Sequence, residues 1–477
     1  FDKSCFGTEQ GMGAVIMKNK FVMKRVILLL ALIGVLCHSV AQAQLKNSQV
    51  KYVVLITIDG LRLEMITEKE MPSPVLKELV GTGTLVERVI SVAPAMTYPN
   101  HTTLVTGARP IHHGIYYNSP FEGNRKTGVA NWYADSIKCP TIWGKAKEHG
   151  LITCSLFWPV STHGKDIDYN VPEYWSIDKN VTLWELLKKS STPAGILDEI
   201  EKETIGRFSD KTCRPGQRNG DLRAAFMAVY LLDKYKPNLT TIHLWSTDHS
   251  QHETGTESVE TKKSLAAVDY AIGEIIDGLK HAGMLDSTVL VITGDHGFTN
   301  VNRSIAPNVW LTEAGLLSSD PGNWKAKFYG AGSTAFLYLK DKNDRKTLDK
   351  VRAKLNSLPE EKKGLFRVVE RKELEELGCS RDVVIALEPI VGVGVTSIAT
   401  GEDIIIKKAG KHGYLLPRET TSTIFWGKGI AAGKVLKEMN ITDIAPVIME
   451  VLGIDFTAPD GVLHPEILEC FEGEIPF

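Results

Sequence analysis

From Lys51 onward, short apolar runs alternate with longer amphipathic stretches. Apolar runs of about four to eight residues are typical of buried strands, whereas apolar positions three and four apart indicate helices. Strands that alternate with helices predict an α/β fold with a mainly parallel central sheet. The predicted strands are Tyr52–Ile58, Thr84–Ser91, Leu151–Phe157, Thr240–Trp245 and Val289–Thr293.

The clearest helix is predicted over Thr261–Ala282, and Gly283 provides a C-terminal stop. Its apolar residues follow one another at spacings of three and four, which places them on one continuous stripe. They are Leu265, Val268, Ile272, Ile275 and Leu279.

The pattern changes between Asn300 and Ala409, where charged helical stretches separate fewer apolar runs. We therefore expect a small α+β insertion at residues 320–405 and a catalytic α/β domain at residues 44–319 and 406–477. Within the insertion the pattern predicts a strand at Phe336–Leu339 and helices at Asp341–Leu358 and Val368–Leu377. The core pattern returns with a strand at Ser422–Trp426 and a helix at Thr442–Leu452.

Residues 1–43 have the order of a secretory signal preceded by upstream residues. Basic residues at 18–25 precede the apolar run Val26–Leu36, and Ala41-Gln42-Ala43 resembles a cleavage site. The run is short for a membrane span, so we expect export to the periplasm or the medium and no stable span after cleavage. Cys37 lies in a poor context for lipidation, which makes a lipoprotein the weaker alternative.

Composition and charge narrow the class of partner. The chain has 477 residues, of which 43% are hydrophobic, and its formal net charge is −2. Such a chain offers no broad basic surface for duplex nucleic acid. Any phosphate group is therefore expected to be recognised locally, by metal ions or by oriented donors.

Polar residues that carry chemistry follow the predicted strands. Asp59 follows the first, Thr97 lies a few residues beyond the second, Asp248 follows the fourth, and Asp295-His296 follow the fifth. Ligands bind at the carboxyl ends of strands in open α/β sheets. We therefore expect these clusters to meet at one edge of the sheet.

Several of these residues have spacings that suit metal ligands. Asp248-x-x-x-His252 places a carboxylate and an imidazole on one face of a helical turn, and Asp295-His296 could join two sites. Taken singly, each strand-end Asp is equally compatible with a turn, and His412 with a surface position. Together, three Asp and three His predict two divalent cations with mixed N/O ligands, most consistent with zinc.

Thr97 admits two interpretations. Pro99 follows two residues later, so Thr97 could simply cap a helix that runs through His101–Val105. A hydroxyl at a helix N-terminus also lies where a phosphate binds, and metal coordination would turn it into a nucleophile.

These motifs, taken in order, resemble those of the nucleotide pyrophosphatase/phosphodiesterase family of the alkaline phosphatase superfamily. The resemblance covers most of residues 50–430 and implies a three-layer α/β sandwich. The matching segments are Ile58-Asp59-Gly60, Thr97-Tyr98-Pro99-Asn100-His101, Thr106-Gly107, His113-Gly114-Ile115, Asp248 with His252, Asp295-His296-Gly297 and His412-Gly413-Tyr414.

The resemblance also implies roles for individual residues. One zinc would be held by Asp248, His252 and His412, and a second by Asp59, Asp295, His296 and Thr97. Asn118 would donate to a non-bridging phosphate oxygen.

Three further residues are expected at the substrate. Tyr98 replaces a common phenylalanine and could stack on the substrate, and Trp158 would shape the pocket wall. His243 occupies the position, five residues before Asp248, where members that bind nucleotides often have a stacking tyrosine. This departure weakens the assignment of nucleotides as the substrate.

The resulting prediction is a two-metal hydrolase of phosphate diesters or nucleotide pyrophosphates that forms a phospho-threonine at Thr97. A phosphomonoesterase or phosphonate hydrolase would share the metal sites but usually needs a cationic clamp, for which Lys145 or Lys165 are candidates. A phosphoethanolamine-type transferase would typically carry several membrane spans. A catalytically inactive binding protein is disfavoured because every expected ligand is present.

Overall fold

The computed structural model describes residues 50–123, 128–178, 180–204, 206–209, 216–318, 322–416 and 418–469. The predicted signal segment at residues 1–43 lies outside the described residues. Within these ranges, no helix is both long enough and apolar enough to cross a membrane.

In the described part of the chain, eight strands form the central sheet. Strands β1, β3, β4, β5 and β6 pair in parallel, whereas β14 is antiparallel to both of its neighbours. The prediction of a mainly parallel sheet is confirmed. In spatial order the strands are β15 (Lys434–Asn440), β2 (Thr84–Ile90), β14 (Thr421–Gly427), β6 (Thr288–Thr293), β1 (Tyr52–Ile58), β5 (Leu239–Leu244), β3 (Thr153–Leu156) and β4 (Tyr169–Val171).

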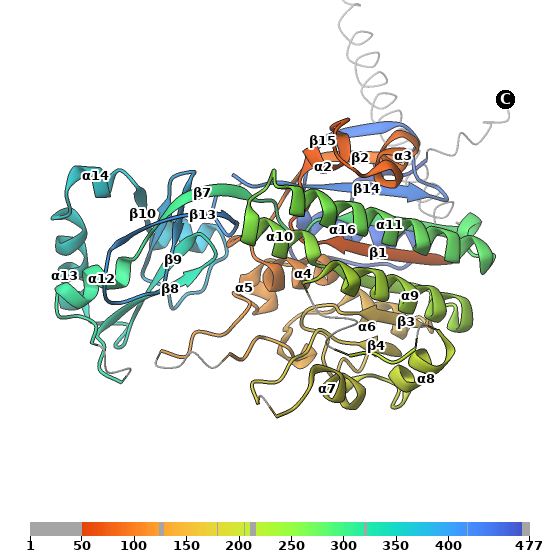
Figure 1. Ribbon diagram of the computed structural model, residues 1–477, viewed down its shortest axis with the longest axis horizontal. Coiled ribbons are helices and arrows are strands. Elements are labelled where there is room, and N and C mark those ends of the chain that lie inside the picture. Colours follow the sequence, from red (N-terminus) through yellow and green to blue (C-terminus); the bar gives the residue numbers. More distant parts are fainter. Residues whose placement is uncertain are drawn as a thin grey trace, which may run out of the picture. The chain divides into compact units, whose positions relative to one another are not determined.

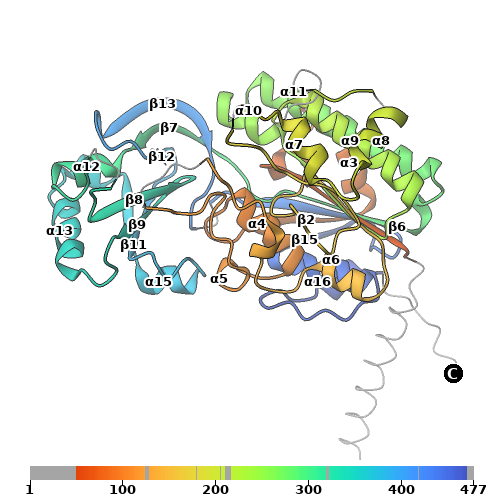
Figure 2. The ribbon, with the colours of Figure 1, turned by 90° about the horizontal axis from the view of Figure 1, so that it is seen from below.

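Helices cover both faces of this sheet, as the two perpendicular views show (Figures 1 and 2). One face carries α3 (Pro74–Thr82), α7 (Leu183–Ser190), α8 (Ile196–Glu203), α9 (Arg218–Tyr235), α10 (Ser246–Thr254) and α11 (Val259–His281). The other carries α4 (Thr97–Thr106), α6 (Ile142–Glu148) and α16 (Ile444–Val451), with α5 (Pro110–His113) beside α4. Helix α2 (Leu63–Thr67) leads into α3. The three-layer prediction is confirmed.

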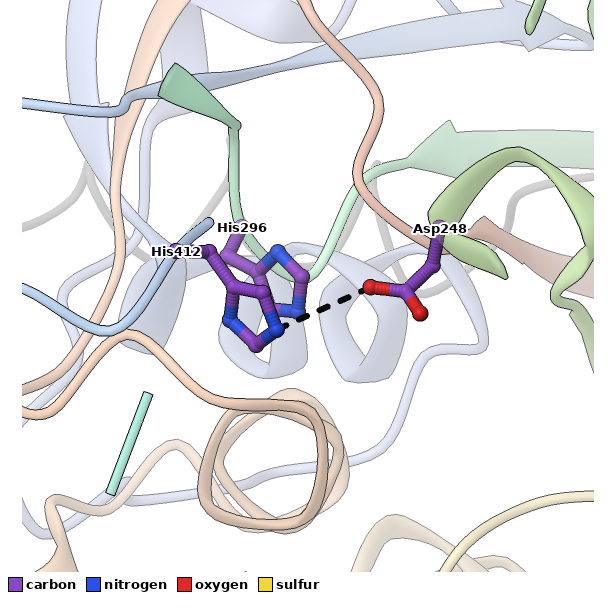
Figure 3. Close-up of side chains that lie close together, drawn as sticks. All are labelled: Asp248, His296 and His412. Atoms are coloured by element: carbon purple, nitrogen blue, oxygen red, sulfur yellow. Dashed lines mark ion pairs between the residues drawn. The ribbon is translucent and has the colours of Figure 1, made fainter. Parts of the chain in front are cut away.

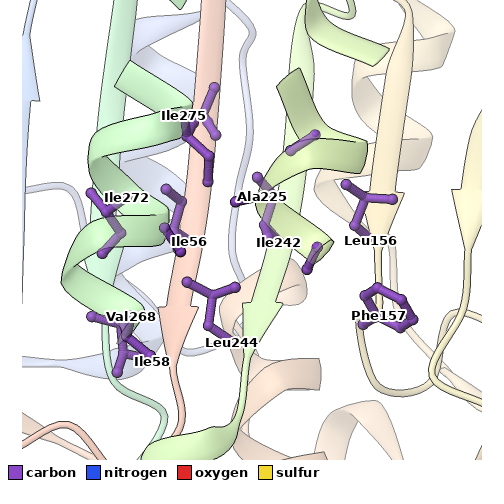
Figure 4. Packing of buried hydrophobic residues seen from close by; sticks show 14 of the residues in the cluster. Ile56, Ile58, Leu156, Phe157, Ala225, Ile242, Leu244, Val268, Ile272 and Ile275 are labelled. Atoms are coloured by element: carbon purple, nitrogen blue, oxygen red, sulfur yellow. The ribbon is translucent and has the colours of Figure 1, made fainter. Parts of the chain in front are cut away.

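Burial on both faces of the sheet explains why the strands are nearly continuous apolar runs in the sequence. Six of the seven residues of β1 are buried, because helices cover both of its sides. Figure 4 shows Ile56 of β1 beside Ile272 and Ile275 of α11, and Ile242 of β5 beside Ala225 of α9. The predicted apolar stripe of this helix is buried along its whole length.

A second lobe lies beside the carboxyl ends of the central strands (Figure 1). Its described residues form an antiparallel sheet of four strands and a sheet of three. Their strands are β8 (Ala326–Ala331), β9 (Thr334–Leu339), β10 (Phe366–Glu370) and β11 (Ile385–Pro389), then β7 (Thr299–Ile305), β12 (Val393–Val395) and β13 (Ile404–Lys411). The helices are α12 (Pro307–Glu313), α13 (Arg345–Asn356), α14 (Glu360–Lys363) and α15 (Arg371–Glu376).

One predicted element of this lobe is wrong in part. The helix expected over Val368–Leu377 begins only at Arg371, because the residues before it form strand β10. Val369 is fully buried in that strand, which pairs with β11. As for the predicted domain boundaries, residues 319–320 lie outside the described residues and residue 405 falls inside β13. The division into domains stays a prediction.

Candidate active site

The strand ends bring the predicted polar residues together. Asp59 directly follows β1, and Asp295 and His296 follow β6 by two and three residues. Helix α10 begins two residues after β5, so Asp248 lies in its first turn. His412 directly follows β13 of the second lobe, and Figure 3 shows its ring lying against that of His296, with Asp248 facing both.

Among the described residues, two groups of Asp and His side chains have the compactness of a metal site. In one, Asp248, His296 and His412 place a donor atom each within 4.8 Å of the others. In the second, Asp59, Asp295 and His296 do the same. His296 belongs to both groups, so the two candidate sites adjoin.

The three predicted histidine ligands share one orientation. Each ring engages a backbone carbonyl through Nδ1: His252 with Gly410 at 3.0 Å, His296 with Gly297 at 3.0 Å and His412 with Ala95 at 2.8 Å. A carbonyl can only accept, so Nδ1 carries the proton in each ring and Nε2 keeps its lone pair. This arrangement is common among metal-binding histidines.

The carboxylates complete the arrangement. Oδ1 of Asp59, Oδ1 of Asp248 and Oδ2 of Asp295 are buried and have no hydrogen-bond partner. Each of these oxygens faces an Nε2 atom at 3.3 to 3.6 Å. Two ligands that are each about 2.0–2.2 Å from a tetrahedral zinc ion lie about 3.3–3.6 Å apart. The donor set and its spacing therefore fit zinc.

The electrostatics of the site also favour cations. Burial raises the pKa of Asp59 well above its usual value, and the carboxylates of Asp295 and Asp248 add to the effect. Burial lowers the pKa of His412 well below its usual value, with further contributions from His296 and His252. A bound divalent cation would stabilise the ionised carboxylate and the neutral imidazole, which are the forms that bind metal.

Thr97 is the first residue of α4, and its side chain does not cap the helix. The capping interpretation is therefore wrong: Met96 occupies the N-cap position in extended conformation, which leaves the Thr97 hydroxyl free for other contacts. Its Oγ1 lies 3.5 Å from Nε2 of His296. Thr97 therefore lies beside the second group of candidate ligands, Asp59, Asp295 and His296, and at the N-terminus of α4, where the helix dipole is positive.

Asn118 lies against the start of the same helix. Its Oδ1 accepts the backbone N–H of Tyr98 at 3.0 Å. A backbone N–H can only donate, so this contact fixes the amide and turns Nδ2 away from Tyr98.

A cavity of about 590 Å³ opens beside Asp59, Thr97 and Asn118. Aromatic and aliphatic side chains form most of its wall, and no Lys or Arg lines it among the described residues. The other lining residues are Tyr98, Ser119, Ala130, Phe157, Pro172, Glu173, Tyr174, Trp175, Leu183, Leu187, Gly216, His243, Trp245, Asp248 and His249.

Comparison with known proteins identifies the family of the chain. Residues 53–415 match the family described as type I phosphodiesterase / nucleotide pyrophosphatase. The chain belongs to this family. It is accordingly a hydrolase of phosphodiester or nucleotide pyrophosphate bonds, from a family that depends on metal ions.

Its relatives are diverse in length. The chain is 24% identical to ectonucleotide pyrophosphatase/phosphodiesterase family member 7 of Rattus norvegicus, over 93% of this chain and 92% of the relative. It is 26% identical to family member 1 of Homo sapiens, over 55% of this chain and only 25% of that longer protein. The solved structure of human ectonucleotide pyrophosphatase/phosphodiesterase 5 has a TM-score of 0.62 at 20% identity, over 88% of this chain and 100% of that one. The fold is thus that of this phosphodiesterase family.

Two residues expected at the substrate are largely buried in the phosphodiesterase. Trp158 is completely buried and does not line the cavity, and its indole donates to the carbonyl of His101 at 3.3 Å, so it offers no face to a substrate. His243 borders the cavity but is 2% exposed, and its Nε2 lies 3.2 Å from Oδ2 of Asp59. Tyr98 lines the cavity as expected, and its hydroxyl is engaged by Glu173.

Two further residues of the cavity wall, Glu173 and Trp245, were not predicted from the sequence. Glu173 follows β4, a strand of only three residues whose shortness hides it from pattern analysis. Once β4 is recognised, the rule that polar residues at strand ends are functional would select Glu173. Trp245 directly follows β5 and precedes Asp248, so the same rule applied to aromatic residues would have found it.

Proposed function

We propose that the protein is an exported phosphodiesterase that uses two zinc ions and Thr97 as its nucleophile. The observation that carries this proposal is the set of three Nε2 atoms that face buried carboxylate oxygens without a hydrogen-bond partner. Protein groups do not satisfy these oxygens, and cations would. The first zinc would be held by Asp248, His252 and His412, and the second by Asp59, Asp295, His296 and Thr97.

Thr97 would act by in-line displacement. Its Oγ attacks phosphorus, the bond from phosphorus to the leaving oxygen breaks, and a phospho-threonine forms. Water then attacks the same phosphorus, releases the phosphoryl product and regenerates the Thr97 hydroxyl. Bound zinc would supply a lowered pKa for the hydroxyl and positive charge for the leaving oxygen.

Groups of the chain itself would hold the phosphoryl oxygens. Nδ2 of Asn118 and the backbone N–H of Thr97, at the start of α4, are the donors we expect at an equatorial oxygen. Asn118 is a neutral donor whose direction is set by its contact with Tyr98. Such a pair suits the single charge of a diester.

The cavity supports a diester rather than a monoester. A monoester carries one more negative charge, which other enzymes neutralise with Lys or Arg, but the described cavity wall has neither. Lys145 pairs instead with Glu148 at 2.6 Å, and Lys165 borders a separate cavity beside Asp166. The second ester group would lie against Tyr98, Tyr174, Trp175 and the other apolar wall residues.

A nucleoside group is one candidate for that second substituent. A murine ectonucleotide pyrophosphatase/phosphodiesterase 5 structure of the same fold is described as a complex with AMP. The aromatic wall would accept a base or another flat or apolar group equally well.

The test compares nitrophenyl diester and monoester substrates of matched leaving group on metal-replete protein. We expect the diester to give the higher kcat/KM and Thr97→Ala to abolish both activities. Faster turnover of the monoester would contradict the diesterase proposal, and Lys145→Ala and Lys165→Ala would then be tested first.

Export is proposed from the basic and apolar pattern of residues 1–43 together with the extracellular naming of the relatives. We expect the secreted or periplasmic protein to begin near Gln44. Mass spectrometry of the N-terminus after cell fractionation would check this, and an intact leader on a cytosolic protein would contradict it.

A further inference from the structure

Glu173 joins two parts of the site that are far apart in sequence. It lies two residues after β4, on the cavity wall, and its side chain is 20% exposed. Oε1 accepts the Tyr98 hydroxyl at 2.9 Å, and Oε2 lies 3.2 Å from Nδ1 of His243. Because both oxygens are engaged by internal donors, the carboxylate is oriented by the protein itself.

His243 continues the connection. Its ring is almost completely buried between Glu173 and Asp59, with Nε2 3.2 Å from Oδ2 of Asp59. This contact occupies one oxygen of Asp59 and leaves Oδ1 directed at Nε2 of His296. The orientation of the Asp59 carboxylate therefore depends on His243. The ring of His243 is held in turn through Nδ1, which lies 3.2 Å from Oε2 of Glu173 and 3.3 Å from the backbone carbonyl of Phe157.

The other end of the connection reaches the nucleophile. Tyr98 follows Thr97 in the first turn of α4, and its backbone N–H binds Asn118. The Tyr98 ring is 2% exposed, so its hydroxyl has little access to water as an alternative to Glu173. Glu173 thus fixes the wall beside Thr97 as well as the ligand Asp59.

We propose that Glu173 is a positioning residue: through His243 it holds Asp59 in the orientation that binds a cation, and through Tyr98 it fixes the cavity wall beside Thr97. The inference rests on the proposed two-zinc function. A residue that only shaped the cavity would affect substrate affinity, whereas a positioning residue also affects metal affinity.

The decisive variant is Glu173→Gln. Its amide oxygen can still accept the Tyr98 hydroxyl, but its NH₂ group cannot accept from Nδ1 of His243. We expect the affinity of the metal-free protein for zinc, measured by competition with a chromogenic chelator, to fall about 10-fold or more at one of two sites, as loss of such supporting contacts typically does. In zinc-saturated protein, kcat for a small diester should fall with little change in KM.

Glu199→Gln is the matched control. Glu199 also accepts tyrosine hydroxyls, those of Tyr230 and Tyr235, but it lies on α8 outside the cavity wall. Its zinc affinity and kcat should equal those of the wild type. A Glu173→Gln protein that matches this control in zinc affinity and kcat would overturn the proposal, and so would a change in KM alone.

His243→Gln provides a second route if Glu173→Gln folds poorly, as thermal unfolding of the metal-free protein would show. It should weaken zinc binding similarly, and the double variant should be no weaker than His243→Gln alone, because both act through one contact. Additive losses, or unchanged zinc affinity in His243→Gln, would contradict the connection. Wild-type protein that binds fewer than two zinc ions or lacks diesterase activity would instead contradict the proposed function.

Discussion

Asn118 offers a test that separates a catalytic donor from a structural support. Its two amide atoms have different tasks: Oδ1 accepts the Tyr98 N–H at 3.0 Å, and Nδ2 is left to donate to the substrate. Asn118→Ala removes both functions. Asn118→Asp keeps the acceptor for Tyr98 but replaces the donor with a second carboxylate oxygen.

The expected losses differ in size. Loss of a donor to a developing negative charge typically costs about 10²–10³-fold in kcat, which is the effect we expect for Asn118→Ala. In the Asp variant a carboxylate would face the phosphoryl group. At about 4 Å and an effective dielectric constant of about 20, two unit charges repel by about 4 kcal/mol, equivalent to about 10³-fold. Asn118→Asp should therefore be less active than Asn118→Ala, although it is the more conservative change.

The assay is kcat and kcat/KM for a nitrophenyl diester, with zinc content and thermal unfolding measured on each protein. Asn131→Ala is the control, because Asn131 binds the Tyr117 carbonyl near the same loop but does not line the cavity. If Asn118→Asp is more active than Asn118→Ala, the acceptor contact with Tyr98 is what matters. The role of Asn118 as a phosphate donor would then be refuted.

Two further predictions follow from the buried carboxylates. Elemental analysis of the purified wild-type protein should find two divalent cations per chain. Asp248→Ala and Asp59→Ala should each lose one cation and reduce turnover by about 10²-fold or more. Near-normal turnover in either variant would remove the substituted residue from the ligand set. Burial raises the pKa of Glu419 to about 8, so folding favours the protonated carboxyl. The unfolded chain ionises this carboxyl at lower pH than the folded protein does. The folded protein therefore loses stability progressively as pH rises from about 5 to 8. Glu419→Gln should therefore gain stability over the wild type with increasing pH in that window, measured by denaturant unfolding, and a constant difference would contradict this.

The sequence was informative wherever local pattern and fold obey the same rule. The apolar run Tyr52–Ile58 matches β1 to the residue, because a strand covered on both faces is apolar at nearly every position. The stripe on α11 was equally clear. Since the carboxyl ends of parallel strands share one edge, the order of the residues alone was enough to predict that Asp59, Asp248 and Asp295 lie together.

The hydrophobic pattern did not predict the structure where an element was too short, or where contacts with residues far away in the sequence determine the local structure. Strand β4 has three residues, so Glu173 could not be recognised as a strand-end residue. Val368 and Val369 suit either a helix or a strand, and pairing with β11 selects the strand. The buried position of His243 depends on Asp59 and Glu173, which lie 184 and 70 residues away in the chain.

The least visible part of the site is the set of backbone carbonyls behind the histidines. Those of Ala95, Gly297 and Gly410 come from three separate segments, and any residue type could provide them. They nevertheless fix the ring orientation and the protonated nitrogen of each histidine. The protein therefore holds these donors in place through its own contacts, while burial opposes the ionisation of Asp59. A cation that enters this site relieves an electrostatic cost and orders little of the protein, so most of its interaction energy can contribute to affinity.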